Sequence, residues 1–79
     1  MNTIEITTDV IQLNSLLKLA GAIDTGGQIR FLLDEQRILT NGAVETAKRR
    51  QIHPGDIIEI LAGEDGIPAG QWKVVRQGE

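Results

Sequence analysis

Residues 24–55 constrain the fold more than any other part of the 79-residue chain. This segment opens with Thr25-Gly-Gly-Gln28, a threonine followed three residues later by a glutamine, which is the pattern of a helix capping box. Apolar residues then recur at i, i+3 and i+4 spacing, as Ile29, Leu32 and Leu33. We therefore predict a helix over residues 26–35 that buries this apolar face.

A β-hairpin is predicted directly after this helix. The dipeptide Asn41-Gly42 lies between residues 37–40 and residues 43–45, two segments that are typical of short strands. Asn-Gly favours a type I′ turn because both central residues of that turn must adopt positive φ. The basic run Lys48-Arg49-Arg50 follows, and Pro54-Gly55-Asp56 then predicts a turn into another strand.

The residues before this unit predict one strand and one helix. Alternating apolar residues favour a strand over residues 3–7. Leucines and an alanine at helical spacing favour a helix over residues 11–20, for which Thr8 and Asp9 are candidate caps. Gly21 suits the end of that helix.

The residues after the hairpin complete the predicted sheet. Residues 46–51 are polar and are expected to be irregular or a loose strand edge, whereas residues 56–62 are the most apolar strand and the candidate for its centre. Residues 63–70 hold several glycines and a proline, which predicts a loop before a last strand over residues 72–76. The expected fold is α+β, with two short packed helices against one face of a small, mostly antiparallel sheet in a single domain.

Composition excludes several classes of protein. The chain has no cysteine and one histidine, which excludes zinc fingers, iron–sulfur sites and disulfide scaffolds, and we expect neither a metal nor a cofactor. No apolar run approaches the roughly 18 residues of a membrane-spanning helix. The first residues lack the basic and apolar regions of a signal peptide, so a cytoplasmic protein without a membrane partner is expected.

The charges are unevenly distributed along the chain. The formal net charge is −3, which by itself argues against a nucleic-acid partner. Residues 36–53, however, hold four cations and one anion, whereas the rest of the chain holds four cations and ten anions. A basic patch can bind a polyanion whatever the net charge, because salt screens interactions beyond about 8–10 Å. This segregation favours an anionic partner for residues 36–53.

The order of these features resembles the S-four-like (alpha-L) RNA-binding domain. The resemblance covers residues 12–60 and rests on the capped second helix, the turn Thr40-Asn41-Gly42, the basic run, and Pro54-Gly55-Asp56 before an apolar strand. The chain is most similar to the small stand-alone bacterial YaaA/YbcJ-like group, which has an extra strand on each side of the motif. The resemblance implies a non-catalytic protein that contacts structured RNA, most of all ribosomal RNA, in ribosome assembly or another ribosome-associated role.

Charge pattern and resemblance together define a candidate RNA-binding surface. Its members come from the second helix, the turn and the basic run: Thr25, Gly26, Gly27, Arg30, Arg37, Asn41, Gly42, Lys48, Arg49 and Arg50. Bare amides at a glycine-rich helix N-terminus admit a phosphate, and adjacent cations bind several phosphates together. The chain departs from the family at Gln12 and Gly26, where a cation is common, and this departure bears on affinity rather than on fold.

Each of these residues also has a purely structural interpretation. Gly26 and Gly27 can serve a tight link between the helices, Thr25 a cap, and Asn41 the turn. The basic run can protect an exposed strand edge from aggregation. Arg30 lies off the apolar face of its helix and is expected to be exposed, whereas Phe31 is expected in the core.

Catalysis has little support in the sequence. His53 stands alone beside a turn, and adjacent carboxylates such as Asp34-Glu35 do not face one another across a cleft. One alternative is a protein-interaction adaptor that keeps the RNA-binding fold as a scaffold. Another is a β-grasp sulfur carrier, but such proteins act through a C-terminal Gly-Gly, whereas this chain ends Gln77-Gly78-Glu79.

Overall fold

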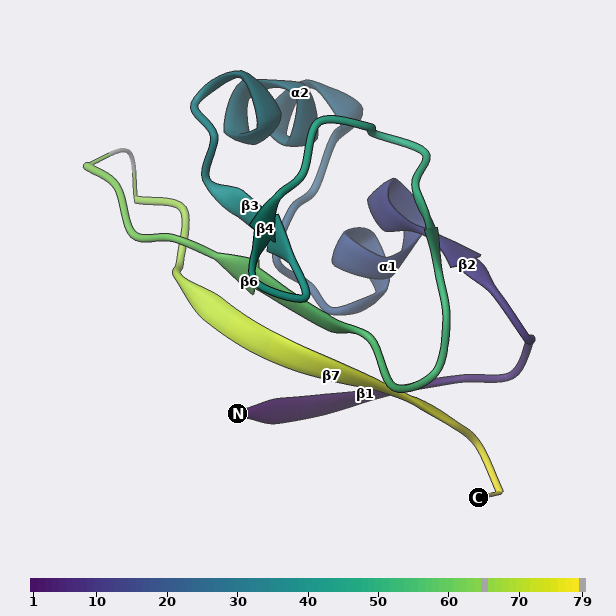
Figure 1. The fold of residues 1–79 in the computed structure, drawn as a ribbon. Coiled ribbons are helices and arrows are strands. Elements are labelled where there is room, and N and C mark those ends of the chain that lie inside the picture. The colour runs from purple at the N-terminus through teal and green to yellow at the C-terminus, as the bar shows by residue number, and fades with distance from the viewer. Residues whose placement is uncertain (65, 79) are drawn as a thin grey trace.

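The computed structural model describes residues 1–64 and 66–78. Two helices in this part of the chain, α1 (Leu13–Leu19) and α2 (Gly26–Asp34), lie over the same face of a sheet (Figure 1). The strands are β1 (Asn2–Ile6), β2 (Ile11–Gln12), β3 (Ile38–Thr40), β4 (Ala43–Val44), β5 (Gln51–Ile52), β6 (Ile57–Ile60) and β7 (Gly70–Arg76). The predicted α+β architecture is confirmed.

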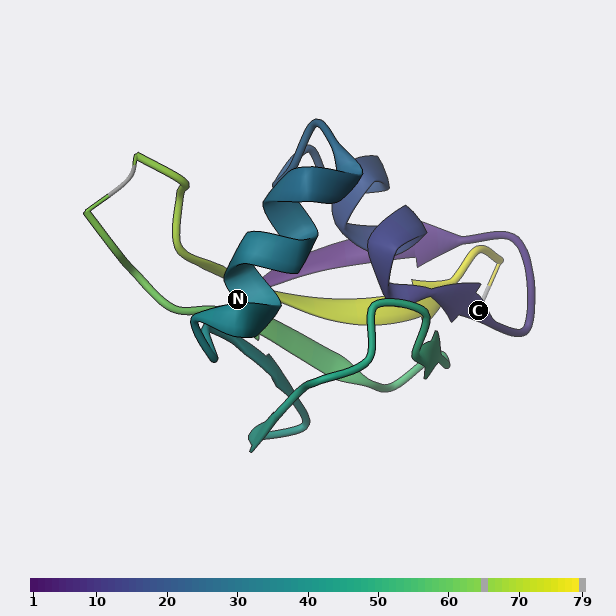
Figure 2. The same cartoon turned by 90° about the horizontal axis from the view of Figure 1, so that it is seen from above.

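The main sheet has the strand order β1-β7-β6-β3-β4 among the described residues. Strand β1 pairs with β7 in parallel, whereas the other neighbours in this sheet are antiparallel. Strand β6 lies at its centre, as its apolar sequence predicts. Seen from above, both helices cross this sheet, and the connection from β6 to β7 projects away from them (Figure 2).

The core lies between the helices and the sheet. Leu13, Leu16 and Leu17 of α1 are buried, as is the predicted α2 face of Ile29, Leu32 and Leu33. The sheet contributes Ile58 and Ile60 from β6, which show the period of two expected of a half-buried strand, and Val74 from β7. Arg30 is exposed, as predicted.

The start of α1 differs from the prediction. The helix begins at Leu13, its N-cap is Gln12, and no side chain caps it, so Thr8 and Asp9 are not caps. Ile11 and Gln12 instead form β2, which pairs with β5 in a second, two-stranded sheet. The first amides of α1 donate to carbonyl oxygens farther along the chain, and this tertiary pairing replaces the local cap that the sequence favours.

The Asn-Gly turn is confirmed, since φ is 51° at Asn41 and 85° at Gly42. The Asn41 side chain accepts a hydrogen bond from the Ile57 amide at 2.9 Å and donates one to Asp56 at 3.1 Å. The second oxygen of Asp56 accepts from the His53 amide at 2.8 Å. Asn41 therefore joins the tip of the hairpin to the turn that precedes β6.

Candidate nucleic-acid interface

Helix α2 begins with the predicted capping box. The Thr25 hydroxyl accepts a hydrogen bond from the Gln28 amide at 3.4 Å, and the Gln28 side chain accepts one from the Thr25 amide at 3.1 Å. Gly26 and Gly27 form the first turn after this cap. Amides in a first turn have no partner within their helix, and the two glycines add no side chains of their own at this turn.

A lysine lies against this first turn. A Cβ placed on Gly26 would stand 3.2 Å from the Lys48 ammonium nitrogen. Lys48 thus adds a full positive charge where the helix already carries the positive end of its dipole. Two positive charges in one place repel each other, and an anion bound between them relieves that repulsion. This corner of the molecule is suited to a phosphate group.

Lys48 belongs to the basic loop, which we define as residues 45–50 and whose backbone is held in place. Glu45 is 2% exposed, and its carboxylate accepts hydrogen bonds from the Thr46 and Ala47 amides, both at 2.9 Å. It also accepts from the Thr40 hydroxyl at 2.9 Å and pairs with Arg50 Nε at 2.8 Å. Hydrogen bonds to this one buried carboxylate therefore hold both ends of the basic loop together.

These contacts govern the protonation of Glu45. Burial raises the pKa of its carboxyl, because the charged form loses hydration. The hydrogen bonds from the Ala47 amide, the Thr40 hydroxyl, Arg50 and the Thr46 amide together outweigh burial, so the pKa lies below its ordinary value. Glu45 is a carboxylate at neutral pH.

Helix α1 fixes the basic loop from the other side. The Leu13 amide donates to the Arg50 carbonyl oxygen at 2.9 Å, and the Asn14 amide donates to that of Lys48 at 3.2 Å. The backbone that carries the cations is thus pinned at Glu45 and at the start of α1. A pre-formed basic surface loses less conformational entropy on binding than a flexible one.

The structure brings most of the predicted site residues together. Arg30 and Lys48 line one hollow beside α2, together with Leu33, Asp34 and Thr46. Arg49 and Arg50 line a neighbouring shallow hollow with Ala47, Gln51 and His53. The Asn41-Gly42 turn lies at the far end of this surface, because Asp56 bonds both Asn41 and His53.

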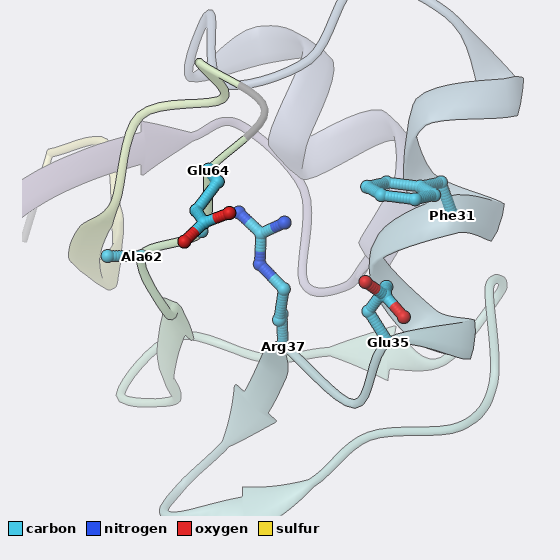
Figure 3. Close-up of a pocket in the computed structure, with 6 residues that line it drawn as sticks. Phe31, Glu35, Arg37, Ala62 and Glu64 are labelled. Atoms are coloured by element: carbon cyan, nitrogen blue, oxygen red, sulfur yellow. The ribbon is translucent and has the colours of Figure 1, made fainter.

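Arg37 is not part of this group. It is 8% exposed, and its Nε donates to the Leu61 carbonyl oxygen at 3.1 Å. Its guanidinium lies against Gly63, where an added Cβ would stand 2.4 Å from the Arg37 Cζ atom. Arg37 lines a separate hollow with Phe31, Glu35, Ala62, Gly63 and Glu64 (Figure 3).

The position of Phe31 also differs from the prediction. Its side chain is 42% exposed and is not in the core. Phe31 follows Arg30 on α2, which turns about 100° per residue, so the ring lies between the buried face and the side that meets residues 61–64. Spacing along a helix predicts the buried face well but does not show which flanking residue a neighbouring loop leaves uncovered.

Glu45 is the main residue that sequence reasoning missed. In the charge count it is a single anion that weakens a basic segment, whereas in the structure it organises that segment. Its signal is a lone carboxylate at the end of a predicted strand, three residues before a run of three cations. In the described part of the chain, no three His, Cys, Asp or Glu residues are grouped as metal ligands, and neither helix could cross a membrane.

Two comparisons with known proteins show the family of the chain. A family model described as S4 domain matches residues 4–67, most of the chain. The chain belongs to the S4 domain family. This S4 domain is also 37% identical over 59 residues to the probable ribosome maturation protein RlbA of Bacillus subtilis (strain 168). The aligned residues cover 75% of this chain and 83% of that protein. The region that the family model matches contains both helices, the hairpin and the basic loop.

Proposed function

We propose that this S4 domain is a non-catalytic protein that binds structured ribosomal RNA and acts in ribosome maturation. The observation that supports the proposal best is the Lys48 ammonium beside the bare first turn of α2, on a loop that Glu45 holds in place. The relative in Bacillus subtilis, named as a probable ribosome maturation protein, supports the ribosomal role.

The proposed contact surface follows from the placement of the cations. It comprises the α2 N-terminus, an exposed helix cation, the basic loop and the hairpin tip: Thr25, Gly26, Gly27, Arg30, Asn41, Gly42, Lys48, Arg49 and Arg50. Arg37 is left out because it is buried and lies at the other hollow. Phosphate and 2′-hydroxyl contacts are expected to dominate, since the exposed aromatic Phe31 is not on this surface.

The test is a pair of charge-matched double variants. Lys48→Ala with Arg49→Ala removes two cations from the proposed surface and leaves Arg50, which the fold needs as a partner of Glu45. Lys18→Ala with Lys73→Ala removes two exposed cations elsewhere and serves as the control. Each protein is sedimented with purified ribosomal subunits and titrated with a ribosomal RNA hairpin at several salt concentrations.

We expect the surface variant to bind about tenfold or more weakly, with a slope of log affinity against log salt that is lower by roughly one per lost phosphate contact. The control variant should bind like the wild type. Equal binding by both variants would show that the proposed surface does not contact the RNA. Wild-type protein that stays at the top of the gradient, even at low salt, would favour the alternative of a protein-interaction adaptor.

A further inference from the structure

A second hollow lies on the other side of α2 from the basic loop. Phe31 and Glu35 project into it from the helix, and Ala62, Gly63 and Glu64 close it from the chain that leaves β6 (Figure 3). Its volume is about 590 Å³, in the range of sites that hold a side chain or a small ligand. Nothing in the proposed RNA contact uses these residues.

A buried arginine is bonded to the chain that forms one wall of the hollow. Arg37 Nε donates to the Leu61 carbonyl oxygen, and the Leu61 amide donates back to the Arg37 carbonyl oxygen at 2.8 Å. The guanidinium also packs against Gly63, at a distance that leaves no room for a Cβ. These contacts join residues 61 and 63 to Arg37, which lies three residues after the end of α2.

The chemistry of the hollow is that of a cation receptor. The Phe31 ring is 42% exposed, and an aromatic face attracts cations. The carboxylates of Glu35 and Glu64 lie beside the same space in Figure 3. Arg37 is the one cation among the described lining residues, and its Nε already donates to the Leu61 carbonyl oxygen. Two carboxylates against one guanidinium leave the described lining with a net charge of −1, which attracts a cation.

This chemistry disfavours nucleic acid at the hollow. Two carboxylates repel phosphate, and a base that stacked on Phe31 would bring its own phosphates close to them. A guanidinium suits the site better, because it is planar, stacks on an aromatic ring and donates to carboxylates through its forked N–H groups. An ammonium can lie on the ring and pair with one carboxylate. It lacks the planar, forked shape that lets a guanidinium stack on the ring and donate to carboxylates at the same time.

We propose that the hollow of Phe31, Glu35 and Glu64 is a docking site for an arginine side chain of a partner protein. The basic loop and this hollow flank α2 on opposite sides, so an RNA and a basic protein can be held at once. The charge of the hollow complements an arginine-bearing segment. The proposal does not depend on RNA binding by the basic loop.

The test uses three acetylated and amidated tripeptides, Gly-Arg-Gly, Gly-Lys-Gly and Gly-citrulline-Gly, added to isotope-labelled full-length protein and followed by two-dimensional NMR. Citrulline has nearly the shape of arginine but no charge. We expect the arginine peptide to shift the amide signals of residues 31, 35 and 62–64 in a saturable manner, at about millimolar affinity. The citrulline peptide should bind at least about tenfold more weakly.

Three variants locate the effect. Phe31→Ala and Glu64→Gln alter exposed side chains, and each should weaken the arginine peptide several-fold without changing the spectrum of the folded protein elsewhere. Lys48→Ala with Arg49→Ala should leave the titration unchanged. Absence of saturable shifts, equal binding of the citrulline peptide, or shifts at these residues with adenosine monophosphate or spermidine but not with the arginine peptide would each overturn the proposal.

Discussion

The basic loop and the segment of residues 61–64 are built on the same plan with the charges exchanged. The basic loop carries Lys48, Arg49 and Arg50 and is folded around the buried carboxylate of Glu45. Segment 61–64 carries an acidic residue and is fastened by the buried guanidinium of Arg37. In each region a buried charge of one sign fixes a surface of the opposite sign.

Glu45 and Arg37 differ in the contacts that each makes with the segment around it. Glu45 accepts four hydrogen bonds, two of them from the backbone of its own loop, and is 2% exposed. Arg37 is 8% exposed and acts through the Leu61 carbonyl oxygen and its packing on Gly63. The comparison indicates that the basic loop depends on the Glu45 carboxylate together with two backbone hydrogen bonds from α1, whereas segment 61–64 depends on Arg37 together with the β3–β6 pairing beside it.

The largest effect is expected from Glu45→Ala. This change leaves two loop amides and the Thr40 hydroxyl without their acceptor, and it unpairs Arg50. We expect the free energy of unfolding to fall by about 2–4 kcal/mol. This is a large share of the total free energy of unfolding, which is roughly 5 kcal/mol for a domain of this size. The measurement is urea unfolding followed by the fluorescence of Trp72, which packs partly buried on the core.

Glu5→Ala is the matched control, because Glu5 is an exposed carboxylate on the edge strand β1. It should change the free energy of unfolding by less than about 0.5 kcal/mol. If the Glu45 and Glu5 variants were equally stable, Glu45 would not be the residue that holds the basic loop together.

The second effect concerns the other region. Gly63→Ala places a methyl group 2.4 Å from the Arg37 Cζ atom, so either the guanidinium or the loop must move. We expect a loss of about 1–2 kcal/mol, measured by the same urea unfolding. Combining the change with Arg37→Ala forms a double-mutant cycle. The cost of Gly63→Ala should vanish in the Arg37→Ala background, and a cost that persisted there would place the strain elsewhere.

Most of the fold could be predicted because its signals are local. The capping box of Thr25 and Gln28 and the Asn41-Gly42 turn each depend on residues within four positions, and both are present as predicted. The start of α1 and the β2–β5 pair could not be predicted, because they depend on pairs of residues that lie 34 to 41 positions apart in the chain. No local pattern encodes such a partner.

The same distinction between local and distant contacts applies to the candidate site. The segment 48–50 stood out in the sequence because like charges are adjacent there, and the structure adds Arg30 beside Lys48. The burial of Arg37 could not be foreseen, because an arginine before a strand is usually exposed and only the distant Leu61 and Gly63 enclose it. Charge patterning identifies the type of partner, whereas burial decides which cations can reach it.

A third prediction uses the pH dependence of Glu45. Because its pKa in the folded state is below the ordinary value of 4.5, ionised Glu45 stabilises the fold above that pH. This contribution is lost as the pH falls below 4.5 and through the lower pKa of the folded state. Neutralisation removes the charge but leaves the shape of the carboxyl group, so the effect should be smaller than that of Glu45→Ala.

The measurement compares the wild type with Glu45→Gln in urea unfolding from neutral pH to about pH 3. The wild type should be the more stable of the two at neutral pH, and the difference should narrow steadily below pH 4.5. A difference that stayed constant over this range would mean that the ionisation of Glu45 does not contribute to holding the basic loop.

The smallest effect, and the sharpest separation of binding from stability, is expected from Gly26→Ala. The new Cβ would lie 3.2 Å from the Lys48 ammonium, which is the free end of a flexible side chain and can move by a few tenths of an ångström. Stability should hold or rise by about 0.5–1 kcal/mol, because alanine favours a helix more than glycine does. Affinity for ribosomal RNA should nevertheless fall roughly two- to fivefold, the range that corresponds to a charge at a helix terminus. Gly27→Ala adds the same methyl group to the same turn but makes only an ordinary 3.8 Å contact with the Thr25 hydroxyl, so it separates the displacement of Lys48 from the effect of the methyl group itself. Equal affinities of the two variants, measured by titration of the same RNA hairpin, would show that the contact between Lys48 and the first turn of α2 plays no part in binding.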